Sequence, residues 1–176
     1  MTVPNTYFEW AAKLEQFGRG DDSVISDLQQ GTFAVDAGTV YRFYNKAQEA
    51  YVERKKRWLD KFNRLFQVQY VKTENDISIV LQDAKTNLQP IAKFIQLKAF
   101  PDDLRNTLKK DFHGFVTEVR KNIKESIMRS QPHNEKMLLI INNFNFFESD
   151  LQAVDPNKSL AEPPSAETTN KRRILF

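Results

Sequence analysis

The sequence of 176 residues has no cysteine, two histidines (His113 and His133) and five glycines. Without cysteine the chain can form neither a disulfide framework nor a thiolate metal site, and it has no thiol nucleophile. It also lacks a phosphate-binding glycine loop, a nucleophile elbow and a pair of histidines at metal-ligand spacing. We therefore expect a protein that is not an enzyme, has no catalytic residues and needs no cofactor or metal.

Long hydrophobic runs are missing as well. The longest strongly apolar stretch, residues 137–141, is far too short to cross a bilayer. The opening MTVPNTYFEW has no basic segment followed by an apolar one, as a secretory signal would require, and the acidic Glu9 and Glu15 argue against an organelle transit peptide. These features predict a cytoplasmic protein that does not insert into a membrane.

The sequence does contain apolar residues at helical spacing, whereas the strict alternation typical of strands is never sustained. The expected helices cover residues 5–17, 22–30, 39–72, 75–91, 102–130 and 135–151. Asn75 or Asp76 is expected to cap the fourth of these, and Pro90 to kink or split it. The fold class is therefore all-α, an elongated and mostly antiparallel bundle of five or six helices.

The third of these helices is the longest, because no proline or glycine interrupts residues 39–72. At about 1.5 Å per residue it would form a rod of roughly 50 Å. Its apolar stripe contains Val40, Tyr44, Ala47, Tyr51, Trp58, Phe62 and Leu65. The stripe has a gap at Arg54 and Lys55, which we interpret as the point where packing on the chain's own helices ends. The fifth helix has a more regular stripe of Leu104, Leu108, Phe112, Phe115, Val119, Ile123 and Ile127.

Charge is unevenly distributed along the chain. Residues 1–35 carry two cations and five anions, whereas residues 36–72 carry nine cations and four anions. The possible nucleic-acid-binding residues are Arg54, Lys55, Lys56, Arg57, Trp58, Lys61 and Arg64. These cations could bind phosphates while Trp58 and Tyr51 stack on bases. The alternative is a solvated face that is neutralised by acidic residues of segments 1–35 or 132–155.

The composition changes near residue 156. Residues 1–155 are expected to form a single helical domain, and residues 156–176 a flexible polar tail. The tail ends in Lys171, Arg172, Arg173, Ile174, Leu175 and Phe176. This basic-apolar ending has the form of a docking peptide. It resembles in outline the terminal peptides with which replication proteins bind a sliding clamp, although the glutamine of the bacterial peptides is absent, and also the basic-apolar peptides that cyclins bind. The alternatives are docking to another protein and folding back onto the chain's own core.

The 14 phenylalanines supply more bulky apolar surface than a small bundle easily buries. We therefore expect an interaction protein, an adaptor or a subunit of a larger assembly, whose partner is another protein or a second copy of the chain. The contact surface would be formed by the long helix and residues 134–147, with Arg172–Phe176 as a docking peptide. The alternative function is nucleic-acid binding by the basic residues 54–64.

Overall fold

The computed structural model describes residues 3–34, 36–68 and 71–151, and within these ranges it is helical and contains no strand. The elements are α1 (Tyr7–Gly18), η1 (Asp22–Val24), α2 (Ile25–Gln30), α3 (Val40–Val68), α4 (Glu74–Phe94), α5 (Asp102–Ser130) and α6 (Glu135–Asn143). The prediction of a helical protein is confirmed. The sequence predicts one helix of about 30 residues, whereas α3 and α5 each contain 29 residues.

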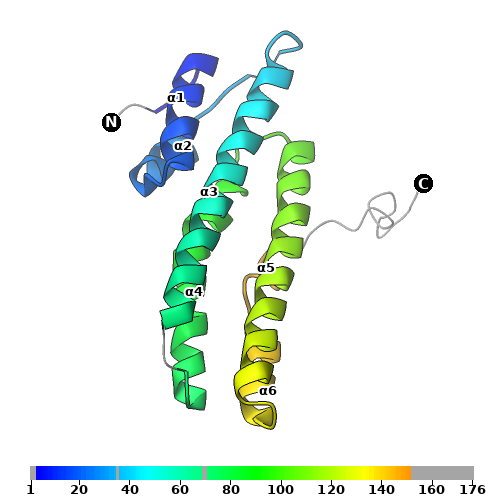
Figure 1. The fold of residues 1–176 in the computed structure, drawn as a ribbon. Coiled ribbons are helices and arrows are strands. Elements are labelled where there is room, and N and C mark those ends of the chain that lie inside the picture. The colour runs from blue at the N-terminus through cyan, green and yellow to red at the C-terminus, as the bar shows by residue number, and fades with distance from the viewer. Residues whose placement is uncertain (1–2, 35, 69–70, 152–176) are drawn as a thin grey trace, which may run out of the picture.

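The three longest helices lie side by side and give the described part of the chain an elongated shape (Figure 1). The chain runs down α3, up α4 and down α5, as the colours in Figure 1 show. Helix α1 packs against α3, and α6 packs against both α4 and α5. Helix α3 therefore has α1, α4 and α5 as neighbours.

Local sequence signals explain where the first helices begin and end. Thr6 and Glu9 form a capping box at the start of α1, and the helix ends at Gly18, one residue beyond the predicted end. The following Gly20 has a φ of 107°, which a residue with a Cβ atom rarely adopts. This conformation places a turn between α1 and η1.

Helix α4 differs from the prediction in two respects. Its N-cap is Thr73, which forms a capping box with Asp76, so neither Asn75 nor Asp76 is the cap. Pro90 does not split the helix, which continues to Phe94. The expected helix over residues 39–72 is also shorter than predicted, because α3 ends at Val68.

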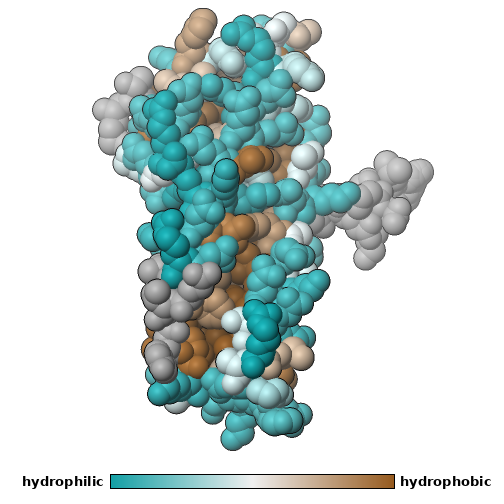
Figure 2. Space-filling model, viewed as in Figure 1, coloured by the Kyte–Doolittle hydropathy of each residue, from teal (hydrophilic) through white to brown (hydrophobic). Residues whose placement is uncertain are grey.

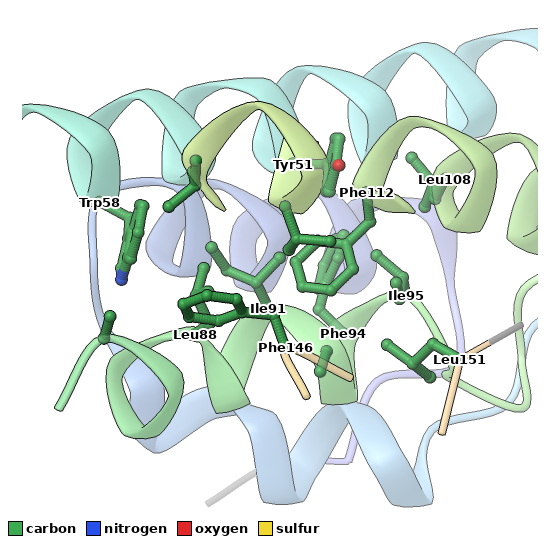
Figure 3. Packing of buried hydrophobic residues seen from close by; sticks show 14 of the residues in the cluster. Tyr51, Trp58, Leu88, Ile91, Phe94, Ile95, Leu108, Phe112, Phe146 and Leu151 are labelled. Atoms are coloured by element: carbon green, nitrogen blue, oxygen red, sulfur yellow. The ribbon is translucent and has the colours of Figure 1, made fainter. Parts of the chain in front are cut away.

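The core lies where α1, α3, α4, α5 and α6 meet. Figure 3 shows side chains from several of these helices pointing toward one another, including Tyr51, Ile91 and Phe112. Six of the seven residues in the predicted stripe of α5 are buried. The exception is Phe115, which is half-buried, whereas its neighbour Val116 is 1% exposed. The prediction erred here because one step of three residues, from Phe112 to Phe115, fits the helical period as well as a step of four does.

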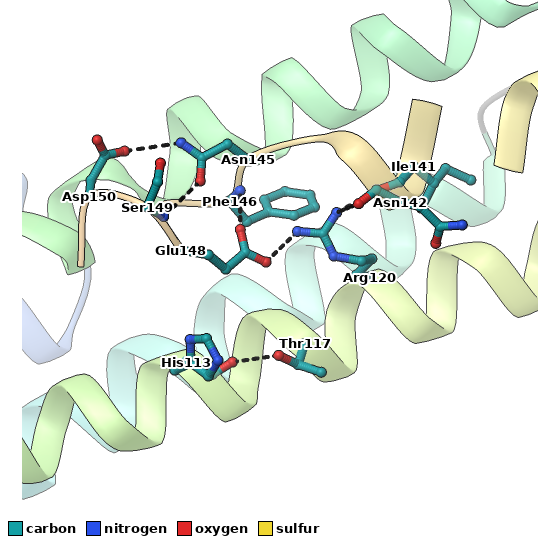
Figure 4. Close-up of polar contacts among 10 residues, drawn as sticks. All are labelled: His113, Thr117, Arg120, Ile141, Asn142, Asn145, Phe146, Glu148, Ser149 and Asp150. Carbon is teal, nitrogen blue, oxygen red and sulfur yellow. Dashed lines mark hydrogen bonds and ion pairs between the residues drawn. The ribbon is translucent and has the colours of Figure 1, made fainter. Parts of the chain in front are cut away.

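Helix α6 ends at Asn143 rather than at Leu151 as predicted. Beyond it the backbone turns, and the amides of Phe146 and Ser149 donate to the side chains of Glu148 and Asn145 (Figure 4). The guanidinium of Arg120 on α5 pairs with Glu148 and donates to a backbone carbonyl at the end of α6. These side chains replace helical hydrogen bonds, so Phe144, Phe146 and Phe147 pack on the core without a helix.

Residues 152–176 lie outside the described residues, and with them the whole of the predicted tail, residues 156–176. No helix in the described ranges is long and apolar enough to span a membrane.

Candidate interaction surface

The seven predicted nucleic-acid-binding residues all lie on α3, in the half of the helix that leads to Val68. The structure separates them into three kinds of environment. Two cations are packed against aromatic rings, one residue is part of the core, and four cations are exposed. The cluster is therefore not one continuous basic face.

Arg54 is held against the end of α1. Its side chain is 11% exposed and forms an ion pair with Asp22. Its guanidinium carbon lies 4.7 Å from the centroid of the Phe17 ring, and Nη1 donates to the Phe17 carbonyl across 3.2 Å. One acidic residue of segment 1–35 thus neutralises Arg54, as the solvated-face alternative predicts.

Lys55 joins α3 to α5. Its Nζ lies 2.6 Å from Oδ2 of Asp111 and 5.3 Å from the centroid of the Phe115 ring. The same carboxylate oxygen accepts the hydroxyl of Tyr51 across 2.7 Å. Burial and this hydrogen bond raise the pKa of Tyr51, so its phenol stays protonated.

The gap in the stripe of α3 does not mark the end of intramolecular packing, so that interpretation is wrong. The side chains of Arg54 and Lys55 fill the gap, packing against rings while their charged ends reach carboxylates. Trp58, which follows the gap, is only 7% exposed.

The remaining four cations are exposed. Arg57 binds Glu53 on its own helix, with 3.0 Å between Nη2 and Oε2. Lys56, Lys61 and Arg64 are exposed, and none of them forms an ion pair with any residue that the structure describes. These three cations remain available to an anionic partner.

The proposed stacking role of the aromatic residues is contradicted. The ring of Trp58 is stacked on Phe62, with 5.0 Å between ring centroids, and meets Phe115 edge-on. Tyr51 is 2% exposed. Both rings are part of the core, so neither presents a free face to a base.

Two adjoining clefts open beside this part of α3. The first, which we call the apolar cleft, has a volume of about 160 Å³ and lies between α3 and α4. It is lined by Trp58, Lys61, Phe62, Phe66, Val80, Asp83, Ala84, Thr86 and Asn87. Phe62 and Phe66 are stacked with 5.5 Å between ring centroids, and both are half-buried.

The second cleft, which we call the basic cleft, has a volume of about 350 Å³. It is lined by Arg19, Gly20, Asp22, Arg54, Arg57, Trp58, Lys61, Thr86, Asn87 and Pro90. Sequence reasoning did not find Arg19, Thr86 or Asn87, which come from the end of α1 and from α4. Only tertiary packing brings these residues next to α3, and no local pattern marks them.

Hydrophobic surface is also visible elsewhere along α3. In the space-filling view, brown side chains line a furrow on the face where α3 and α5 lie in front (Figure 2). Leu59 of α3 and Phe115 of α5 are half-buried hydrophobic residues that line neither of the two clefts. The C-terminal half of α3 therefore carries apolar surface that the described residues cover only in part.

The second predicted contact surface, residues 134–147, is largely covered by the chain itself. Met137, Ile141 and Phe146 are fully buried. Leu139 is the large hydrophobic residue of this segment that remains exposed, at 60%. Of the described phenylalanines only Phe8 is exposed, so the argument from an unburied aromatic excess does not hold for this part of the chain.

The remaining candidates from the sequence are the two histidines and the C-terminal docking residues. His113 and His133 are both exposed, and no group of three or more His, Cys, Asp or Glu that could hold a metal occurs among the described residues. The predicted docking residues Arg172, Arg173, Ile174, Leu175 and Phe176 lie outside the described residues. Comparisons with known protein families, with curated proteins and with solved structures give no match.

Proposed function

We propose that this protein is a non-enzymatic interaction protein, an adaptor or a subunit of a larger assembly, that binds a partner protein with the C-terminal half of α3. The observation that carries the proposal is the apolar cleft, in which Phe62 and Phe66 remain half-buried against α4. Partly exposed aromatic side chains in a concave site are typical anchor points of protein interfaces.

The wider features of the proposal follow from the sequence. The helical domain of residues 1–155 acts as an elongated, mostly antiparallel scaffold in the cytoplasm. In the tail, Arg172–Phe176 act as a second, independent docking element. The two elements would raise the affinity for a partner that engages both.

A truncation and a substitution test the docking peptide and the cleft separately. Deleting residues 170–176 should weaken capture of the partner while the helical content and the melting temperature stay unchanged. Replacing Phe66 by alanine should weaken capture through the cleft instead. Sedimentation of the purified full-length chain over a range of concentrations distinguishes a second copy from a different partner. Partner recovery that neither change reduces would contradict the proposal.

Nucleic-acid binding is the second candidate. Lys56, Lys61 and Arg64 favour it, since they are exposed and form no ion pair within the described ranges. Arg54, Lys55 and Arg57 weaken it, because each is paired with a carboxylate of the chain. This candidate predicts an affinity for single-stranded oligonucleotides that falls steeply with salt, and that is lost when Lys56, Lys61 and Arg64 become glutamates.

A further inference from the structure

The apolar and basic clefts adjoin each other and share part of their lining. Trp58, Lys61, Thr86 and Asn87 line both of them, so the clefts meet along one turn of α3 and one turn of α4. One end of the combined site is rich in rings and aliphatic side chains, and the other is rich in cations. A ligand that fills both ends must itself be apolar at one end and charged at the other.

The basic end is positively charged, although the chain neutralises part of this charge. Arg19, Arg54, Arg57 and Lys61 line it. Arg19 is paired with Glu15, Arg54 with Asp22 and Arg57 with Glu53. Arg57 uses Nε and Nη2 for Glu53, which leaves Nη1 free to donate. Lys61 has no carboxylate partner among the described residues, and its Nζ can donate into either cleft. These donors suit one or two anionic oxygens.

The apolar end has a different character. Phe62, Phe66, Val80 and Ala84 line it, and Asp83 is its only carboxylate. The rings of Trp58, Phe62 and Phe66 stack on one another with interplanar angles of 5° and 11°. Much of their ring faces is therefore covered, and the cleft suits a compact hydrophobic side chain better than a stacked base. Asp83 would repel a carboxylate of the ligand at this end. The acidic part of a ligand is therefore expected at the basic end.

We propose that the combined site binds an acidic peptide segment of a partner protein, with a hydrophobic side chain in the apolar cleft and a neighbouring carboxylate at Lys61 and Arg57. This inference rests on the proposed function and names the chemistry of its partner. Charge complementarity at the basic end orients the segment, and the hydrophobic side chain supplies the anchor.

Two other occupants fit less well. The chain's own Lys171–Phe176 is apolar too, but its three cations have the same sign as the basic end and would be repelled from it. A nucleic acid would need several separate phosphate contacts and exposed ring faces. The cleft offers a single cluster of cations, three of which already hold carboxylates of the chain.

The experiment selects a displayed library of random dodecapeptides on the full-length protein. The best sequence is then synthesised with its acidic residues intact and with each replaced by the matching amide. We expect enriched peptides to combine a hydrophobic residue with a nearby Asp or Glu, and the amide version to bind about tenfold more weakly. Lys61→Gln should weaken binding of the acidic peptide and leave binding of the amide version unchanged. Lys56→Gln removes the same charge from the same helix outside both clefts and should change neither affinity.

The possible failures are distinguishable. Equal binding of acidic and amide peptides, or no effect of Lys61→Gln, overturns the inference but leaves a peptide-binding surface and hence the proposed function in place. An oligonucleotide that displaces the peptide and binds more tightly also overturns the inference and favours the second candidate function. If no peptide is enriched, or if Phe66→Ala with an unchanged melting temperature leaves peptide binding intact, both the inference and the cleft-based function fail.

Discussion

The hydroxyl of Tyr51 on α3 donates a hydrogen bond to Oδ2 of Asp111 on α5 across 2.7 Å, and joins residues that are 60 apart in the sequence. Lys55 reaches the same oxygen across 2.6 Å. Asp111 thus receives two donors from α3 and fixes the position of α3 relative to α5, beside the proposed interaction surface.

Removing the acceptor, Asp111, should lower the free energy of unfolding more than removing the donor hydroxyl of Tyr51. Tyr51→Phe loses one hydrogen bond and should reduce the free energy of unfolding by about 1 kcal/mol. Asp111→Ala leaves the partly buried phenol without an acceptor and should cost about 2 kcal/mol. Denaturant unfolding of both variants measures the difference. If Asp111→Ala proves no more destabilising than Tyr51→Phe, the carboxylate does not hold the two helices together.

Alkaline pH should destabilise the protein through its tyrosines. Burial, aided by Asp103, raises the pKa of Tyr44 to about 12, and burial likewise raises the pKa of Tyr51. Because the unfolded chain ionises at the ordinary pKa of about 10, the stabilisation is complete below that pH and is lost as the pH rises through the folded value. Urea unfolding between these pH values should show the loss. The doubly substituted variant Tyr44→Phe and Tyr51→Phe should have a flatter profile, and an equally steep profile would contradict the assignment.

The capping box of α4 should make the helix sensitive to acid. The carboxylate of Asp76 accepts the backbone amides of Lys72 and Thr73, each across 3.0 Å, and these hydrogen bonds lower its pKa. The resulting stabilisation is present above the ordinary carboxyl pKa of about 4 and is lost as the pH falls through the lower folded value. Asp76→Asn should therefore reduce the loss of stability in acid.

Thr73, the other residue of this capping box, allows the contribution of the cap to be tested at neutral pH. Thr73→Ala removes the hydroxyl that accepts the amide of Asp76 and should cost about 1 kcal/mol. Thermal unfolding followed by circular dichroism measures both variants. A Thr73→Ala protein with unchanged stability would show that the cap contributes nothing.

Two glycines should respond to alanine in opposite directions. A Cβ atom at Gly31 would lie 2.7 Å from Cζ2 of Trp10, which is fully buried, so Gly31→Ala should destabilise the protein by about 1–3 kcal/mol. Gly114 lies within α5 with open space around the position of its Cβ, so Gly114→Ala should stabilise by about 0.5–1 kcal/mol. Comparing the two melting temperatures with that of the unmodified protein tests the packing of α1. Equal shifts of the same sign would refute it.

The helices could be predicted because their signals are local. The regular spacing from Leu104 to Ile127 identified both α5 and most of its buried face. The end of α6 could not be predicted, since it depends on Arg120 from another helix. The apolar residues that directly follow Asn143 fit the helical pattern equally well, and side-chain hydrogen bonds of Arg120, Asn145 and Glu148 hold the backbone in another conformation.

The candidate site could be predicted only in part. The run of cations from Arg54 to Arg57 pointed to the correct half of α3, but the sequence does not show which of them are neutralised. Asp22 and Asp111 lie far from the cluster in sequence and reach it only through packing. The clefts were missed for the same reason, because α4 supplies one of their walls.

A photo-crosslinking amino acid at position 86, which lines both clefts, tests the central claim most directly when it is compared with the same residue at the exposed position 128 of α5. Crosslinking of the full-length protein in the native source, followed by mass spectrometry, should give a discrete protein partner from position 86 and not from position 128. Substituting Phe66 by alanine should reduce that crosslink in protein that remains folded. The same products from both positions, or crosslinks from position 86 to nucleic acid alone, would contradict a protein-binding surface at these clefts.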